Sequence, residues 1–180
     1  MKHNWLSYID KLQSENGDDI AFYPLDALAT ALESGHIITG EENGVPAGYL
    51  WHGPIHPSRP IAIYQACIDY DLRRRQLGHN LVRQLIDIGK VSGATAIRLR
   101  CASSSESTQF WQAIGFYVTN VTTGGQRRKR DINHFWADLR PTLLVAPSVT
   151  PSTVPVDERQ YFRDRRKKTK MPSRFSRKHY

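Results

Sequence analysis

The sequence has no apolar run long enough to cross a bilayer, which takes about 18 consecutive residues. In the N-terminal segment MKHNWLSYIDKLQ, polar residues such as Asn4, Ser7 and Asp10 interrupt any block of the kind found in secretory signal peptides. We therefore expect a protein without membrane contact, located in the cytoplasm.

Cysteine is also scarce: Cys67 and Cys101 are the only two, and they lie far apart in β-prone segments. This pattern excludes a disulfide framework, and the absence of a CxxC pair argues against zinc. His52 and His56 are separated by a turn-forming Gly-Pro-Ile segment, and no third ligand is apparent. The sequence predicts no metal site, a loop around the two histidines, and two buried thiols on adjacent strands that could lie near each other.

Acidic residues are few at the C-terminal end. Residues 157–180 hold ten Lys or Arg against three Asp or Glu, whereas the chain as a whole has a net charge of +8. The preceding residues 141–156 are rich in Pro, Ser and Thr and are typical of a linker, so we place the boundary of a single folded domain near residue 140. The basic tail is expected to bind nucleic acid or another polyanion, the alternative being a solubilising terminus.

Residues 1–140, in contrast, show alternating helical and strand patterns. An Asn-Gly pair joins two extended runs and predicts a hairpin. A nearly continuous apolar run beginning at Ile61 predicts a central strand. The expected helices cover residues 4–15, 24–35, 78–93 and 107–115, and the expected strands cover 36–52 (the hairpin), 61–69, 94–102, 116–122 and 132–139.

One junction between these elements has an unusual composition. The segment YDLRRRQLGHNLVRQLI, residues 70–86, crowds three arginines between a strand and the start of an amphipathic helix. The first N–H groups of a helix have no helical acceptors and share the positive end of the helix dipole. The junction therefore favours a phosphate-bearing ligand, with a solvated basic helix start as the alternative.

The region from Ile61 to Val118 resembles the central part of the GNAT superfamily of N-acetyltransferases. Arg73-Arg74-Arg75-Gln76-Leu77-Gly78 stands where the family has its Q/R-x-x-G-x-G/A pyrophosphate loop, and Phe110-Trp111-Gln112-Ala113-Ile114-Gly115-Phe116 resembles its aromatic Gly-Phe motif. The resemblance covers roughly residues 20–138. The segments QACIDYDLRR, RLRCA and GGQRRKRDINHFW also resemble small phage-encoded GNAT-like proteins.

The resemblance implies an α/β fold, a GNAT-like mixed central sheet flanked by helices, followed here by the extended basic tail. It also implies acetyl-CoA as acyl donor, with a splayed strand around residues 66–68 that offers a backbone N–H to the acyl carbonyl. The residues expected to hold the cofactor are Ala66, Cys67, Ile68, Arg73, Arg74, Arg75, Gln76, Leu77, Gly78, His79, Asn80 and Ser104.

Four positions depart from the family pattern. Gln76 replaces the first loop glycine, so we expect no residue there that is free to adopt positive φ. Trp111 stands where many members have a tyrosine that protonates the leaving thiolate, and Ala62 stands where some have a glutamate base. Ser104 stands where an asparagine often contacts pantetheine.

The catalytic residues are therefore unknown from the sequence. Ser104 is the catalytic candidate that we single out, and Tyr64, Asp69 and Glu106 are alternative bases; residues of these four kinds are more often simply packed or solvated. Two functions stay open: an acetyl-CoA-dependent N-acyltransferase with an unidentified amine acceptor, or a binding or structural protein of the same fold that has lost catalysis. The second includes a phage protein, located in the host cytoplasm or the virion.

Overall fold

A computed structural model describes residues 4–17, 20–124 and 130–140 of the chain. The predicted linker 141–156 and basic tail 157–180 lie outside the described residues. The elements are α1 (Trp5–Glu15), α2 (Leu25–Glu33), β1 (Ile37–Glu42), β2 (Val45–His52), β3 (Ile61–Ile68), the short 3₁₀ helix η1 (Tyr70–Leu72), α3 (Leu77–Val91), β4 (Ala96–Ala102), α4 (Ser107–Ala113), β5 (Tyr117–Thr123) and β6 (Asp131–Asp138). The predicted order of helices and strands is confirmed.

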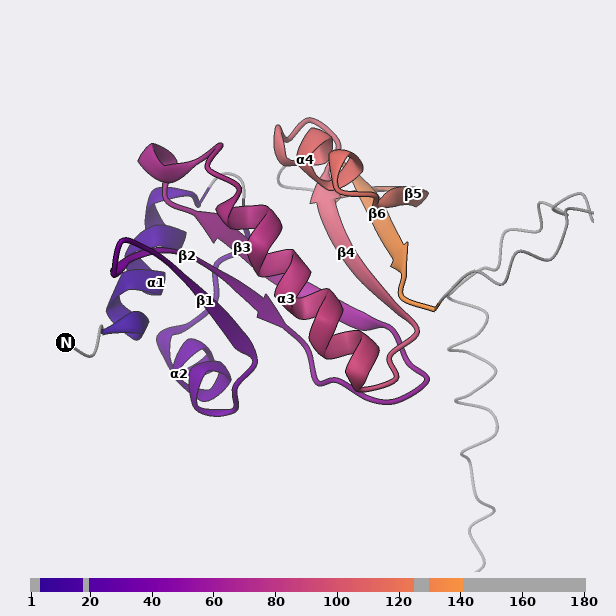
Figure 1. Ribbon diagram of the computed structural model, residues 1–180. Helices are drawn as coiled ribbons and strands as arrows, with labels where there is room; N and C mark the ends of the chain where they lie inside the picture. The colour runs from indigo at the N-terminus through magenta and orange to yellow at the C-terminus, as the bar shows by residue number, and fades with distance from the viewer. Residues whose placement is uncertain (1–3, 18–19, 125–129, 141–180) are drawn as a thin grey trace, which may run out of the picture. The chain divides into compact units, whose positions relative to one another are not determined.

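The strands form one mixed sheet in the order β1-β2-β3-β4-β6-β5. Only β3 and β4 among the described strands run parallel, and they are joined by two residue pairs, Ile61↔Ile97 and Ala62↔Arg98. Beyond these pairs the two strands separate, and Figure 1 shows β4 diverging from β3 toward α4. The sheet is therefore splayed between β3 and β4 at their carboxyl ends.

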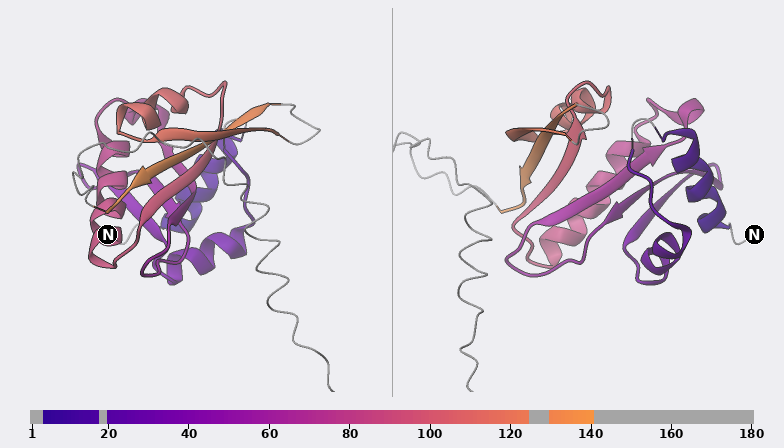
Figure 2. Two further views of the ribbon diagram at one scale, coloured as in Figure 1. Left: turned by 90° about the vertical axis from the view of Figure 1, so that its right-hand side faces the viewer. Right: turned by 180° about the vertical axis from the view of Figure 1, so that it is seen from behind.

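Helices cover both faces of the sheet. The helix α3 packs on β1, β2 and β3 on one face, whereas α1 packs on β2 and β3 from the other (Figure 2). Leu81, Val82 and Leu85, which share one side of α3, are buried in the first core cluster with Ile61, Ile97 and Phe135. The second cluster lies under α1 and α2 and contains Ile9, Leu12, Leu28, Ala31, Tyr49, Trp51 and Cys67.

The predicted hairpin is confirmed: β1 and β2 pair antiparallel and are joined by a turn at Asn43-Gly44. Asn43 and Gly44 both have positive φ, 52° and 76°, as a two-residue turn between twisted strands requires.

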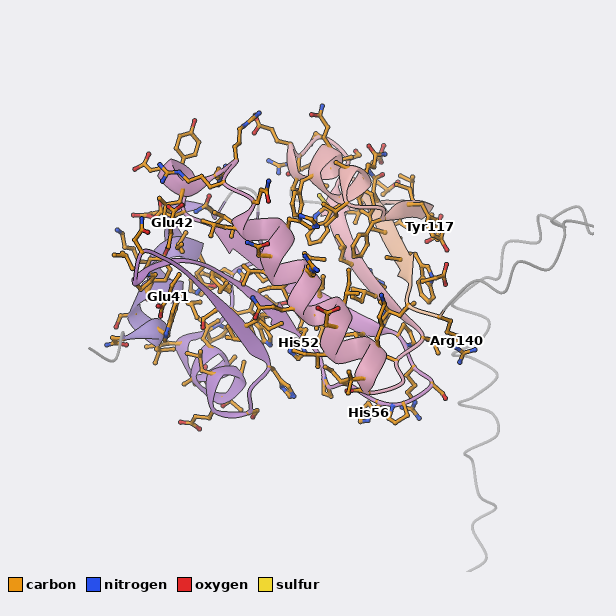
Figure 3. The ribbon with its side chains drawn as sticks, in the orientation of Figure 1. Glu41, Glu42, His52, His56, Tyr117 and Arg140 are labelled. Atoms are coloured by element: carbon orange, nitrogen blue, oxygen red, sulfur yellow. The ribbon has the colours of Figure 1, made fainter. Side chains whose placement is uncertain are left out.

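His52 is the last residue of β2, as the expected strand 36–52 implies, and its side chain is buried; the expected loop begins only at Gly53 and includes His56 (Figure 3). Cys67 belongs to the cluster under α1 and α2, and Cys101 packs against the cluster on the α3 face. The two thiols therefore lie on adjacent strands, as expected, but on opposite faces of the sheet, so the expectation that they could lie near each other is wrong.

Candidate functional site

The loop that leads into α3 has two residues with left-handed backbone. Arg74 and Gln76 have φ values of 65° and 62°, and Gln76 is the N-cap of α3, which begins at Leu77, one residue before the predicted start. The expectation that this loop lacks positive φ because it lacks glycine is wrong. Surrounding contacts hold two non-glycine residues in a conformation that costs each of them about 1–2 kcal/mol.

The start of α3 offers three backbone donors in a row. Its first helical hydrogen bond runs from the Asn80 N–H to the Gln76 carbonyl (2.9 Å), so the N–H groups of Leu77, Gly78 and His79 precede any helical acceptor. The Gln76 side chain makes no capping hydrogen bond. These donors lie at the positive end of a 15-residue helix, which is an arrangement suited to an anion.

The three arginines of the loop have different roles. Arg73 donates through Nη2 to Asn16 Oδ1 (2.7 Å), and Arg75 pairs with Glu42 (2.9 Å), a residue at the hairpin end of β1 (Figure 3). Arg74 is exposed, and no contact of its side chain is found among the described residues. Arg73 and Arg75 therefore position the loop, whereas Arg74 is the arginine whose charge is available to a ligand.

The strand β3 presents an open backbone edge beside this loop. The Asp69 N–H donates to Ala47 O on β2 (3.0 Å), so by alternation the backbone groups of Ala66 and Ile68 point away from β2, toward the splay. Arg73 Nε donates to the Ile68 carbonyl on that side (3.4 Å). Cys67 faces the other way, since its backbone pairs with Tyr49 and its side chain is buried.

A β-bulge interrupts β3 near the apex of the splay. The β2 residues Trp51 and His52 pair with Gln65 and Ile63, which leaves Tyr64 as the extra residue. The Tyr64 side chain is 46% exposed, and its ring meets Trp51 edge to face at 5.8 Å. The bulge turns this tyrosine onto the α1–α2 face, two residues beyond the last pair with β4.

The aromatic motif of α4 packs mainly into the core. Trp111 and Phe116 are buried and their rings meet at 5.2 Å, while Phe110 is partly buried. A Cβ at Gly78 would lie 3.2 Å from Phe110 Cζ, so this glycine allows α3 and α4 to approach closely. With Trp111 only 5% exposed, its indole contributes to packing between α4 and the sheet.

The remaining catalytic candidates are dispersed. Ser104 and Glu106 are exposed in the turn before α4, and Glu106 is the N-cap of that helix. Asp69 accepts the Asp71 N–H (3.3 Å) and so caps η1. Sequence reasoning missed Asn16 and Glu42, because the partners of the arginines are 57 and 33 residues away from them along the chain.

Among the residues that the structure describes, no group of three or more His, Cys, Asp or Glu side chains is arranged to hold a metal ion. None of the described helices is long and apolar enough to span a membrane.

Among the described strands, the mixed sheet is splayed at its one parallel pair, and an open strand edge lies beside a helix start without a side-chain cap. The model of the acetyltransferase (GNAT) family matches residues 3–116, and the chain belongs to this family. Members of the family use acetyl-CoA as acyl donor. A search of curated proteins found no match.

Solved structures share the fold at low sequence identity. The chain is similar to Ard1 from Thermoplasma volcanium (12% identity, TM-score 0.67), with 76% of this chain and 92% of that one covered. It is similar to the ribosomal-protein-S18-alanine N-acetyltransferase from Escherichia coli (14% identity, TM-score 0.62), with 83% of this chain and 96% of that one covered. It is also similar to the structure of yncA from Salmonella typhimurium, a putative acetyltransferase with its cofactor acetyl-CoA (20% identity, TM-score 0.56), with 71% of this chain and 80% of that one covered.

Proposed function

We propose that the protein transfers the acetyl group of acetyl-CoA to an amine. The observation that carries this proposal is the junction of β3 and α3, where three adjacent helix donors stand beside an open strand edge. The N–H groups of Leu77, Gly78 and His79 would hold the pyrophosphate, and Arg74 would add charge. The backbone of Ala66 and Ile68 would pair with the pantetheine amides in the splay.

The remaining predicted cofactor residues take indirect parts in this proposal. Arg73 and Arg75 hold the loop, and Gln76 ends the turn ahead of the donors. Asn80 closes the first helical turn, Cys67 fixes the β2 side of β3, and the exposed Ser104 stands beyond the end of β4, across the splay. The assignment of each to the cofactor site stays a prediction.

In the chemistry, the amine attacks the thioester carbonyl, its nitrogen loses a proton, and the CoA thiolate leaves. A backbone N–H on the open edge of β3 would stabilise the oxyanion. Since Trp111 is buried and an indole is a poor acid, protonation of the thiolate would come from solvent or another group. Positioning of amine and thioester would then supply much of the rate enhancement.

Calorimetric titration with acetyl-CoA and with CoA, combined with an assay for released thiol, tests the proposal. Arg74→Glu should weaken binding about tenfold at low salt, whereas Arg83→Glu should leave it nearly unchanged, because Arg83 is an exposed residue in the middle of the same helix. Equal affinities of the two variants for acetyl-CoA would show that the loop before α3 does not bind the cofactor.

Gly78→Val should also weaken binding by crowding the helix start. Its side chain would additionally press on Phe110, so the fold of this variant must be checked by circular dichroism.

The alternative is a binding or structural protein that kept the fold and lost catalysis, such as one of phage origin. The buried Trp111, and the lack of a clear base among the residues that the structure describes, favour this alternative. Tight CoA binding with no thiol release across a panel of amines would select it.

The tail supports a second proposal, on composition alone: residues 157–180 bind a polyanion such as nucleic acid through counterion release. Deletion of these residues should abolish binding to a random-sequence DNA duplex and leave acetyl-CoA affinity unchanged. Binding by the full chain should fall steeply with salt. A full-length protein that ignores DNA at low salt would refute the assignment.

A further inference from the structure

The two edges of the sheet differ in how well they are protected against pairing with another strand. β1 and β5 are the outermost of the described strands. β1 ends in Glu41 and Glu42 and has a register shift just before Glu41, and charged side chains and such shifts both oppose the addition of a strand. β5, with the sequence YVTNVTT, has no charged residue, no proline and no glycine. Of the two edges, β5 is therefore the one without charge to keep another strand away.

From Asn120 onward, β5 is a regular strand. Its register shift lies before that point, between Val118 and Asn120, and its pairs with β6 then run without interruption to Thr123. The Gly124 N–H donates to the Arg130 carbonyl (2.7 Å), which continues the same register. Hydrogen-bonded pairs alternate with non-bonded pairs along an antiparallel ladder. Counting back from residue 124, the backbone groups of the even-numbered residues face β6, and those of the odd-numbered residues face outward.

Val121 is one of these odd-numbered residues. Its N–H donates to Oδ1 of the neighbouring Asn120 (2.8 Å), which agrees with a backbone that points away from β6. No described strand pairs with β5 on that side. The Val121 side chain is 52% exposed, and it lies on the same face as Val118, which is 36% exposed, because their β6 partners are two residues apart. The outer edge of β5 thus combines outward backbone groups with exposed apolar side chains.

The sequence around Val121 is symmetric in its polarity. Residues 119–123 are Thr, Asn, Val, Thr and Thr, so polar residues flank the valine equally on both sides. An antiparallel copy of the same strand presents this order reversed, and a symmetric order matches its own reverse. The segment also has no charge, whereas two copies of β1 would bring their glutamates together. Both properties favour a second copy of this chain as the occupant of the edge.

We propose that β5 pairs antiparallel with β5 of a second copy of this chain, about a two-fold axis at Val121. The two Val121 residues then form a hydrogen-bonded pair, in which each N–H exchanges the Asn120 side chain for the carbonyl of the other copy. Their side chains meet on one face, and Asn120 meets Thr122 of the other copy on the opposite face. Such a contact is closed after two copies and joins the two sheets edge to edge. The proposal does not depend on acetyl transfer.

Sedimentation velocity of the full chain, at concentrations from about 10 to about 300 μM, tests the proposal. A short strand pair is a small interface, so we expect a reversible dimer with a dissociation constant of about 10–100 μM. Val121→Lys and Val121→Glu should each weaken the dimer at least tenfold, roughly, because two like charges then face each other across the axis. Val91→Lys is the matched control, since Val91 is 90% exposed on α3 and should leave the dimer unchanged.

Mixing the two Val121 variants tests the register itself. Only a two-fold contact places residue 121 opposite its own counterpart, so an equimolar mixture of Val121→Lys and Val121→Glu should form dimers again. A variant that had failed to fold could not do this, and circular dichroism of each variant provides a second check on folding.

Three results would overturn the proposal. A full chain that stays monomeric at about 300 μM would show that β5 does not pair with its own copy. A dimer that Val121→Lys leaves as stable as Val91→Lys does would be formed by another surface, such as the basic tail. A mixture of the two Val121 variants that stays monomeric would refute the two-fold axis at Val121, and would leave β5 as an edge for a peptide of another protein.

Discussion

At the scale of single residues, the loop before α3 holds two of the four described non-glycine residues with positive φ. Arg74 and Gln76 occupy left-handed backbone that glycine adopts without cost, and the pairs Arg73–Asn16 and Arg75–Glu42 hold them there. The motif in the sequence predicted an anion site at this place. It did not predict the positive φ values, because these are imposed by contacts with α1 and β1 that no local pattern encodes.

Gln76→Gly should stabilise the protein. Relief of the left-handed strain, about 1–2 kcal/mol, exceeds the extra chain entropy of glycine in the unfolded state, up to about 1 kcal/mol. The melting temperature should rise by about 2–4 °C, measured by differential scanning calorimetry. Arg75→Gly is the control: Arg75 is not among the residues with positive φ and would lose its pair with Glu42, so no gain is expected. A melting temperature unchanged by Gln76→Gly would show that the loop bears no strain.

His52 should make stability depend on pH. Burial lowers the pKa of its imidazole below 6.5, and the neighbouring His36 lowers it further, against an opposing effect of the hydrogen bond to Gly53 O. As the pH falls below about 6.5, the unfolded chain takes up the proton first, so the free energy of unfolding decreases. Urea denaturation at pH 7.5 and 5.5 should show a smaller loss in His52→Asn, whose amide can replace the Nδ1 donor. The exposed His56→Asn should behave like the unmodified protein.

At the scale of elements, the helices and strands occur where the sequence pattern predicted them, whereas the pairing register of the strands could not be predicted from that pattern. Asn43-Gly44 identified the hairpin, and the apolar run from Ile61 identified β3. The bulge at Tyr64 and the burial of His52 arise from how β2 and β3 register against each other, and a single sequence does not show register. The loop before α3 could therefore be predicted as a candidate anion site from its motif, whereas the contacts of that loop with Asn16 and Glu42 could not, because they join residues far apart in the sequence.

Gly48→Ala should disrupt the β2–β3 pair. A Cβ at Gly48 would lie 2.6 Å from the Cys67 carbonyl oxygen and 2.5 Å from Ile68 Cδ1, and the backbone atom cannot move without displacing β3. We expect a loss of about 1–3 kcal/mol in the free energy of unfolding, measured by urea denaturation. Gly17→Ala is the matched control, since its Cβ would meet nothing closer than 3.6 Å. Equal stabilities of the two variants would mean that β3 adjusts freely.

At the scale of the whole molecule, one sheet joins two groups of elements that differ in what they offer a ligand. β1 to β3 with α1 to α3 provide the unpaired helix donors and the open edge of β3, and β4 to β6 with α4 lie on the other side of the splay. The first core cluster includes residues of both groups, so the splay opens within one packed structure. Under the proposed function, an acyl donor and an amine would meet in this splay.

The open edge of β3 has a consequence for amide hydrogen exchange. Along this strand, the N–H groups of Cys67 and Asp69 lie on the β2 side, while those of Ala66 and Ile68 lie on the side that β4 has left. After the bulge at Tyr64, from residue 65 to residue 69, exchange rates should alternate with a period of two, fast at Ala66 and Ile68 and slow at Cys67 and Asp69. Saturating CoA should slow Ala66 and Ile68 selectively, because the pantetheine amides would act as the missing neighbouring strand. In that state the sheet is completed by a molecule that is not a polypeptide.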